Sequence, residues 1–265
     1  MTILQPATAK ISLTNVHKTF PLDGRPFTAL DDVSIDFAEN EFVTVVGPSG
    51  CGKTTLLNIL AGLETPSGGT ALVDGRHVTG PSPERGVIFQ QYALFPWLSV
   101  RKNVEFGLRT ARVPKAERRE RAQHFIDLVG LTEFAEAMPK TLSGGMRQRC
   151  AIARAYAVDP SILLMDEPFG ALDALTRVRL QEQLLDTWSQ QKRTVLFITH
   201  DVDEAVFLAT RIVVMAAWPG RIYDVIDVPL PYPRTETVRL SPGFADLRNR
   251  VWRAVHHQDP AQRWS

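Results

Sequence analysis

The sequence has few cysteines, no strong charge bias and no long apolar run. Two cysteines among 265 residues exclude a disulfide framework as the basis of the fold. A net charge of +1 gives no electrostatic case for binding nucleic acid. No stretch reaches the roughly 18 apolar residues that a membrane-spanning helix needs. The first ten residues also lack an apolar signal segment. We therefore expect a chain that is neither exported nor inserted in a membrane.

A glycine-rich segment after an apolar run predicts a phosphate-binding loop. Residues 47–54 fit the pattern G-x-x-x-x-G-K-[ST], residues 42–46 before them read as a buried strand, and residues 54–63 have helical spacing. The backbone N–H groups of such a loop and the following helix start attract phosphate oxygens. The candidate nucleotide-binding residues are Gly47, Pro48, Ser49, Gly50, Cys51, Gly52, Lys53, Thr54 and Thr55. Lys53 supplies charge to the outer phosphates, and the Thr54 hydroxyl is a candidate Mg²⁺ ligand.

Asp166 and Glu167 form the acidic part of the predicted site. They follow the apolar residues 162–165, which read as a buried strand, so Asp166 is expected at the carboxyl edge where open α/β sheets bind ligands. We predict that Asp166 holds Mg²⁺ together with Thr54. Glu167, one residue further on, is the candidate for polarising the attacking water.

Two more apolar runs end in polar side chains. His200 follows residues 194–199 and is expected near the γ-phosphate. Gln90 ends the run 87–90, where its amide can reach metal or water. Each of these residues alone is weak evidence for a functional site, and the other motifs strengthen the case for that role.

A second glycine-rich turn at residues 142–146, LSGGM, begins another predicted helix over 146–158. Ser143 suits the N-cap position, and the amides of Gly144 and Gly145 suit an anion. One chain with one nucleotide has no evident need for two phosphate-binding devices. This surplus requires an explanation.

Together these motifs resemble the nucleotide-binding subunit of an ATP-binding cassette (ABC) transporter. The resemblance covers residues 47–200 and rests on the phosphate loop, Gln90, the LSGGM signature, the ILLMDEP strand, the segment 171–173 and His200. Met146 stands where many members have Gln, at a position that varies. The implied activity is Mg²⁺-dependent ATP hydrolysis, with Glu167, His200, Lys53 and Gln90 as catalytic residues and with Gln90 also near the metal.

The resemblance also explains the surplus. It implies a homodimer that sandwiches two ATP molecules, each on the phosphate loop of one subunit and under Ser143, Gly144 and Gly145 of the other. Asp173 would lie across the same seam. Phe20 would stack on adenine, with Phe27 as the competing candidate.

The implied fold is α/β: a P-loop ATPase core with a mostly parallel sheet, an antiparallel β subdomain and an inserted helical subdomain. Alternation over 11–46 and 69–78, with turns at Asp23-Gly24 and Asp74-Gly75, predicts the antiparallel part. We expect a single ABC domain, with the ATP-binding core and β subdomain at 11–98 and 155–228, the helical subdomain at 99–154 and a short extension at 229–265. A last helix is expected over 244–256.

The segment 91–98 is unusually apolar and aromatic, which is typical of an interaction surface. The resemblance implies that the segment Gln90–Leu98 receives the coupling helix of a membrane permease, with Phe95, Trp97 and Leu98 as candidates. Packing of Phe95 and Trp97 inside the helical subdomain remains the alternative. A separate substrate-binding protein would be an indirect partner, and no nucleic acid is expected.

The segments 95–108, 166–177 and 215–222 resemble importers of nitrate, sulfonate and taurine. We expect too few residues after the last helix for the regulatory C-terminal domain that sugar-importer subunits carry, which favours the nitrate, sulfonate and taurine group. The resemblance implies a peripheral subunit at the cytoplasmic face of the inner membrane. An exporter ATPase, a soluble ABC ATPase that acts on ribosomes or DNA, and a P-loop switch or kinase of another family remain as rival classes.

Overall fold

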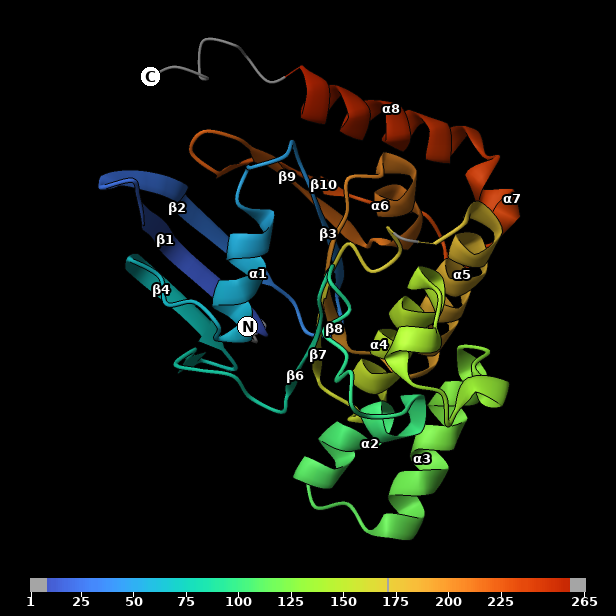
Figure 1. Cartoon of the computed structure of the whole chain (residues 1–265). Coiled ribbons are helices and arrows are strands. Elements are labelled where there is room, and N and C mark those ends of the chain that lie inside the picture. Colours follow the sequence, from blue (N-terminus) through green and yellow to red (C-terminus); the bar gives the residue numbers. More distant parts are fainter. Residues whose placement is uncertain (1–8, 171, 258–265) are drawn as a thin grey trace, which may run out of the picture. The chain divides into compact units, whose positions relative to one another are not determined.

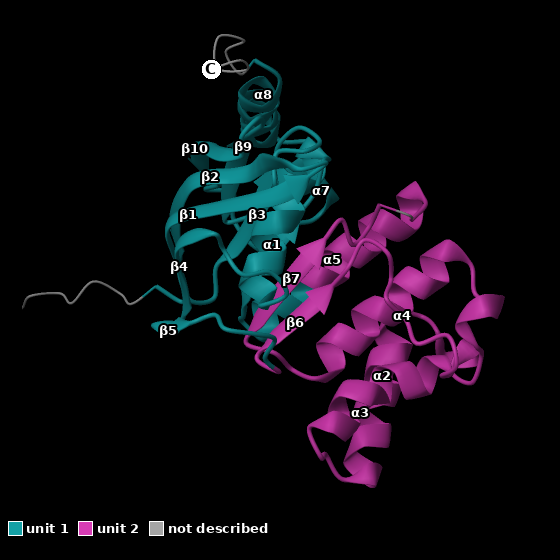
Figure 2. Ribbon diagram, turned by 60° about the vertical axis from the view of Figure 1, so that its left-hand side comes forward, with its two compact units in different colours: residues 1–82, 185–265 teal, residues 83–184 magenta. Residues whose placement is uncertain are grey.

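A computed structural model describes residues 9–170 and 172–257 and divides the chain into two compact units. One unit combines Met1–Ser82 with Leu185–Ser265, and the other is Pro83–Leu184 (Figure 2). Among the described residues no helix is both long enough and apolar enough to cross a bilayer.

An antiparallel sheet occupies the first part of the larger unit. Its strands are β1 (Ile11–Leu22), β2 (Arg25–Phe37), β4 (Gly68–Val73) and β5 (Arg76–His77), in the order β2-β1-β4-β5. Both predicted turns are present: Asp23 and Gly24 have φ of 48° and 76°, and Asp74 and Gly75 have 49° and 71°. Two consecutive positive φ values are typical of tight hairpin turns. The antiparallel part of the fold prediction is therefore confirmed for residues 11–37 and 68–77, whereas residues 42–46, predicted with it, form a strand with parallel neighbours.

The same unit contains a mainly parallel group of strands, one of which leads into the predicted phosphate loop. Its strands are β3 (Phe42–Val46), β8 (Thr194–Ile198), β9 (Arg211–Ala216) and β10 (Arg221–Asp227). Strand β3 pairs in parallel with β8 and β9, and β10 adds an antiparallel edge. Every residue of β3 and β8 is buried, as expected for strands covered on both faces.

Helices accompany these strands in the same unit. They are α1 (Lys53–Ala61), α6 (Val202–Leu208), α7 (Glu236–Arg239) and α8 (Pro242–His256). Helix α6 packs on β3, and α8 packs on α6 and β9 (Figure 1). Helix α8 starts two residues before the predicted helix because Ser241 caps it, accepting from Phe244 N at 3.3 Å, with Pro242 in the first turn.

The second unit is a parallel strand pair with a group of helices. Its elements are β6 (Arg85–Ile88), β7 (Ile162–Asp166), α2 (Val100–Thr110), α3 (Lys115–Leu128), α4 (Gly144–Ala157), the first part of α5 (Ala174–Gln190), and the 3₁₀ turns η1 (Thr132–Phe134) and η2 (Pro139–Thr141). Helices α2, α3 and α4 pack on one another. Pro114 immediately precedes α3, and Pro139 opens the 3₁₀ turn η2.

Arg234 attaches the proline-rich segment 229–233 to the end of α6. Its guanidinium donates to the carbonyl oxygens of Val206, Phe207 and Ala209 at 2.8–3.1 Å, and to that of Leu230 at 3.1 Å. The last carbonyl groups of a helix have no intrahelical donor, so a buried cation there satisfies them and matches the helix dipole. Arg234 is 3% exposed, which makes these bonds costly to lose.

Replacing Arg234 with alanine should therefore lower the free energy of unfolding by about 2–4 kcal/mol. Urea unfolding of the full chain, followed by circular dichroism, measures the change. Arg253→Ala is the matched control, because Arg253 is exposed on α8 and should cost less than about 0.5 kcal/mol. Equal unfolding midpoints for the two variants would contradict the anchoring role.

Candidate functional site

The phosphate loop lies between a buried strand and a helix start. Strand β3 ends at Val46, and α1 begins at Lys53, directly after Gly52. Gly52 has φ of 85°, and a Cβ there would lie 2.5 Å from Leu30 Cδ2. Only glycine can bring the backbone this close to Leu30. The loop therefore runs directly into the first turn of α1, and the amides of both can face the same anion.

The side chain of Lys53 folds over its own loop. Its Nζ donates to the carbonyl oxygens of Gly47 and Pro48 at 2.8 and 2.9 Å. These bonds hold the ammonium group at the centre of the loop, where an anion would meet both its charge and the helix start. The predicted residues 47–55 thus comprise the loop after β3 and the first turn of α1.

The Cys51 side chain lies inside this loop. It is fully buried, and its Sγ accepts a hydrogen bond from Lys53 Nζ at 3.5 Å. Burial raises the pKa of the Cys51 thiol above its ordinary value. Cys150 is part of the core in α4, where burial raises its pKa to about 12.

His200 lies just beyond the end of β8, the parallel neighbour of β3. Val45 pairs with Ile198, so the carboxyl ends of both strands meet at one edge. His200 is exposed there, after the buried Thr199. Asp201 caps α6 by accepting from Glu204 N at 3.1 Å, which fixes the backbone next to His200.

In the second unit, Gln90, Asp166 and Glu167 occupy the ends of neighbouring parallel strands. Ile88 pairs with Met165, so Gln90 follows the end of β6 beside the end of β7. Asp166 is 5% exposed. Gln90 Nε2 donates to Glu167 Oε2 at 3.2 Å. The structure therefore brings together the amide and the carboxylate that the sequence singled out separately.

Glu167 has an unusual backbone conformation, with φ of 46°. Left-handed backbone is unfavourable for a residue with a Cβ and persists where the surroundings enforce it. Such strain is concentrated at functional sites. Here it turns Glu167 away from the direction of β7, toward Gln90.

The signature turn is a capped helix start. Ser143 Oγ accepts from Met146 N at 3.2 Å, the N-cap bond predicted for it. Helix α4 covers Gly144–Ala157, so it begins two residues before the predicted helix and includes both glycines. The amides of Gly144 and Gly145 are therefore in the first turn, where N–H groups lack intrahelical acceptors.

Two side chains that sequence reasoning missed surround this turn. A Cβ on Gly144 would lie 3.3 Å from Tyr92 Oη, and one on Gly145 would lie 3.2 Å from Leu172 Cδ2. The glycines thus allow close packing as well as exposed amides. Tyr92 and Leu172 are far from the signature in sequence, and nothing local in either segment indicates this contact.

Asp173 caps α5. Its Oδ1 accepts from Thr176 N at 3.0 Å, and hydrogen bonds from Thr176 hold the pKa of this exposed carboxyl below its ordinary value. The aspartate is therefore ionised and oriented at neutral pH, at a helix start that stabilises its charge.

The aromatic segment 91–98 divides between the two alternatives considered for it. Phe95 packs on Phe106, with ring centroids 4.3 Å apart, so it belongs to the helical packing. Trp97 is 70% exposed and remains a candidate for an interaction surface. Asn103, fully buried, holds the segment by donating to the carbonyl oxygens of Phe95 and Leu98.

The two candidate adenine-stacking residues are cross-strand partners. Phe20 on β1 pairs with Phe27 on β2, and both side chains are partly exposed. Lys18 Nζ lies 4.7 Å from the Phe20 ring centroid, and Phe27 meets the edge of Trp218 at 5.6 Å.

Comparison with known proteins explains this combination of motifs. The sequence pattern of the ABC transporter family matches residues 30–170. The chain belongs to this family. A putative ATP-binding protein of Brucella abortus is 66% identical over 251 residues, covering 95% of each chain.

Other relatives of this ABC ATPase have more specific names. The aliphatic sulfonates import ATP-binding protein of Bacillus cereus is 46% identical, covering 91% of this chain and 94% of its own. The nitrate import ATP-binding protein of Synechococcus elongatus is 44% identical, covering 98% and 100%.

Solved ABC cassettes share the fold. A bacterial ABC transporter cassette solved as a dimer matches with a TM-score of 0.78 and 34% identity, over 83% of this chain and all of the other. A post-hydrolysis state of that cassette, bound to ADP and phosphate, matches with 0.77 and 33%. The predicted fold class is confirmed, and the chain is an ATP-binding ATPase of this family.

Proposed function

We propose that this ABC ATPase is the energy-supplying subunit of an importer for nitrate, sulfonate, taurine or a similar small solute. The observation that carries the proposal is the presence in one chain of two glycine-preceded or glycine-containing helix starts, at Lys53 and after Ser143, whose first-turn amides suit an anion. Support for the cargo class comes from the names of the sulfonate and nitrate relatives, which align with nearly the whole chain.

In this proposal residues 47–55 bind the ATP phosphates, with Lys53 as the fixed charge. Thr54, Gln90 and Asp166 hold Mg²⁺. The donor types fit this ion, because hydroxyl, amide and carboxylate oxygens are hard ligands, and Mg²⁺ bound to a nucleotide needs only one or two protein carboxylates. When bound, Mg²⁺ would neutralise charge on the phosphates.

Glu167 is proposed to orient the attacking water. The 3.2 Å bond from Gln90 holds its carboxylate in place, so Gln90 serves both as metal ligand and as positioning group. His200, exposed at the strand edge that also carries the phosphate loop, stabilises charge on the γ-phosphate together with Lys53. Phe20 is proposed to stack on adenine.

The signature is proposed to act on the ATP of a second copy. Ser143, Gly144 and Gly145 would meet that γ-phosphate, and Asp173 would lie at the same homodimer seam. The capped start of α4 supports this role, because its exposed first-turn amides attract an anion. ATP binding would then close the dimer, and hydrolysis would reopen it.

The segment Gln90–Leu98, with Trp97 exposed at its end, is proposed to receive a membrane permease at the cytoplasmic face of the inner membrane. A substrate-binding protein would act on the permease. In domain terms, we propose the core and β subdomain at 11–98 and 155–228, the helical subdomain at 99–154 and the extension at 229–265. An ABC exporter ATPase is the alternative, and no nucleic-acid partner is proposed.

Glu167→Gln should retain ATP affinity and lower the hydrolysis rate about 10²–10⁴-fold, because the variant loses the group that orients water. Phosphate release and calorimetric ATP binding measure the two effects. Glu133→Gln, an exposed glutamate of the same unit, is the control. Retained turnover in Glu167→Gln would remove this residue from the mechanism.

Ser143→Arg should prevent ATP-dependent dimers without weakening ATP binding to the monomer, because the bulky cation blocks only the trans contact. Sedimentation velocity in the Glu167→Gln background, which should accumulate ATP-bound dimer, gives the readout. The double variant should remain monomeric with ATP. Loss of monomer affinity on Ser143→Arg would instead indicate that the signature serves the nucleotide of its own chain.

Deleting the gene from its host should abolish growth on nitrate as sole nitrogen source, or on taurine or an alkanesulfonate as sole sulfur source. Wild-type protein should restore growth and Glu167→Gln should not. Growth curves and uptake of labelled solute are the measurements. Unchanged uptake of all three solutes would contradict the proposed cargo class while leaving the ATPase assignment intact.

A further inference from the structure

Trp218 stands beside the phosphate loop and has no part in the roles proposed above. It lies in the turn between β9 and β10. Its Cζ2 is 3.5 Å from the position that a Cβ on Gly50 would take. Its ring also meets Phe27 edge-on, at 5.6 Å and 74°. Trp218 and Phe27 together form an aromatic wall next to the exposed middle of the loop.

The turn that carries Trp218 is bound tightly to its surroundings. Gly220 N donates to Ala29 O at 3.2 Å, and Gly220 O accepts from Asp31 N at 2.9 Å. A Cβ on Gly220 would collide with the carbonyl oxygens of Cys51 and Ala29. Only glycine allows this close approach, which fixes the turn against the backbone of the phosphate loop.

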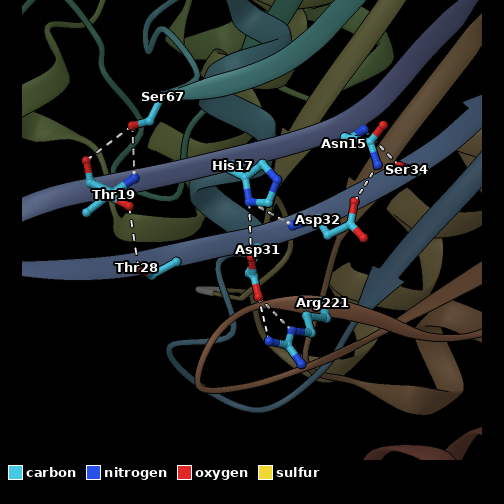
Figure 3. A network of polar contacts seen from close by, with 9 residues as sticks. All are labelled: Asn15, His17, Thr19, Thr28, Asp31, Asp32, Ser34, Ser67 and Arg221. Atoms are coloured by element: carbon cyan, nitrogen blue, oxygen red, sulfur yellow. Dashed lines mark hydrogen bonds and ion pairs between the residues drawn. The ribbon is translucent and has the colours of Figure 1, made fainter.

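A chain of polar contacts holds Arg221, the residue after Gly220 (Figure 3). Arg221 Nε and Nη2 donate to Asp31 Oδ2 at 3.0 and 2.5 Å, and Asp31 Oδ1 lies 3.0 Å from His17 Nδ1. The hydrogen bond from Arg221 is the main reason that the pKa of Asp31 lies below its ordinary value. The turn is thus fixed at Gly220 and Arg221, directly after the position that the indole occupies.

Within this fixed turn, Trp218 itself is in an unfavourable state. Its φ of 62° is left-handed, and 57% of the residue is exposed. A large aromatic residue gains little from burial there, and its backbone conformation is disfavoured. Strain and exposed aromatic surface next to an anion site are together typical of ligand contact.

We propose that Trp218, with Phe27 behind it, contacts the nucleoside part of the bound ATP. The argument for this occupant is continuity: the sugar and base are covalently joined to the phosphates on residues 47–55, and the indole borders that loop at Gly50. Every purine presents a flat face, and aromatic side chains bind such faces without reading base identity. This contact supplements the one proposed for Phe20, and it rests on the proposed ATP site.

The test compares ATP with inorganic tripolyphosphate, which has the same phosphates and no nucleoside. Calorimetry on the full chain should show that Trp218→Ala weakens ATP binding about tenfold, as expected from the loss of one aromatic contact with a base. The Kd for tripolyphosphate should stay within about twofold of wild type. Trp218→Phe should retain most of the ATP affinity. Trp252→Ala, which removes an exposed tryptophan from α8 in the same unit, should change neither Kd.

Three outcomes would overturn the proposal. An unchanged Kd for ATP in Trp218→Ala would show that the indole makes no nucleoside contact. An equal loss with both ligands would show that it only supports the loop.

If Trp218→Ala does not fold, tryptophan fluorescence decides. ATP, and not tripolyphosphate, should change the emission of the wild type, and Trp218→Phe should lack that change. An identical response of the two proteins would overturn the contact. Failure of the wild type to bind either ligand would instead refute the ATP site itself.

Discussion

The first turn of an α-helix has backbone N–H groups without intrahelical acceptors, and the candidate site depends on two such turns being left accessible. Each of these helix starts has a glycine with a close neighbour. A Cβ on Gly52, before Lys53, would clash with Leu30, and a Cβ on Gly145, in the first turn of α4, would crowd Leu172. The close packing keeps both turns rigid, and the missing side chains keep their amides open. Rigid donors bind an anion without reorganising, which is the condition under which charge recognition is strong.

Buried strands supply that rigidity, since every residue of β3, β7 and β8 is buried. In one unit strand β3 leads to the phosphate loop and its parallel neighbour β8 leads to His200. In the other unit β6 leads to Gln90 and its parallel neighbour β7 leads to the acidic pair. Within each unit, parallel pairing brings the polar side chains to one edge, because strand ends of one polarity share an edge. The strained backbone at Glu167 is maintained by the same pairing, which the five buried residues of β7 hold in register.

The parts that could be predicted from the sequence are those with local causes. The phosphate loop, the two Asp-Gly turns and the buried strands all have patterns readable within about ten residues. The start of α4 was predicted two residues late, because glycine has low helix propensity and only the Ser143 cap and the contacts with Tyr92 and Leu172 make it helical. Tyr92, Leu172, Trp218 and Arg234 could not be assigned, because their contacts join segments far apart in the chain. The segment 91–98 was ambiguous for the same reason: Phe95 packs on Phe106 of α2, whereas Trp97 contacts the Phe95 ring and remains 70% exposed.

The segment 91–98 also contacts α4, the helix that begins at the signature, and this bears on how a partner could influence ATP chemistry. Arg154 of α4 donates to Ala93 O at 2.6 Å, and its guanidinium lies 5.6 Å from the Phe95 ring centroid. Arg147, one turn into the same helix, lies over the Tyr92 ring, whose hydroxyl borders Gly144. Residues 92–95 therefore cannot shift relative to α4 without breaking a charge-assisted hydrogen bond and separating these rings from their cations. If Trp97 docks a partner and the start of α4 binds an anion, as proposed, these contacts of a few ångströms join the two surfaces through one helix.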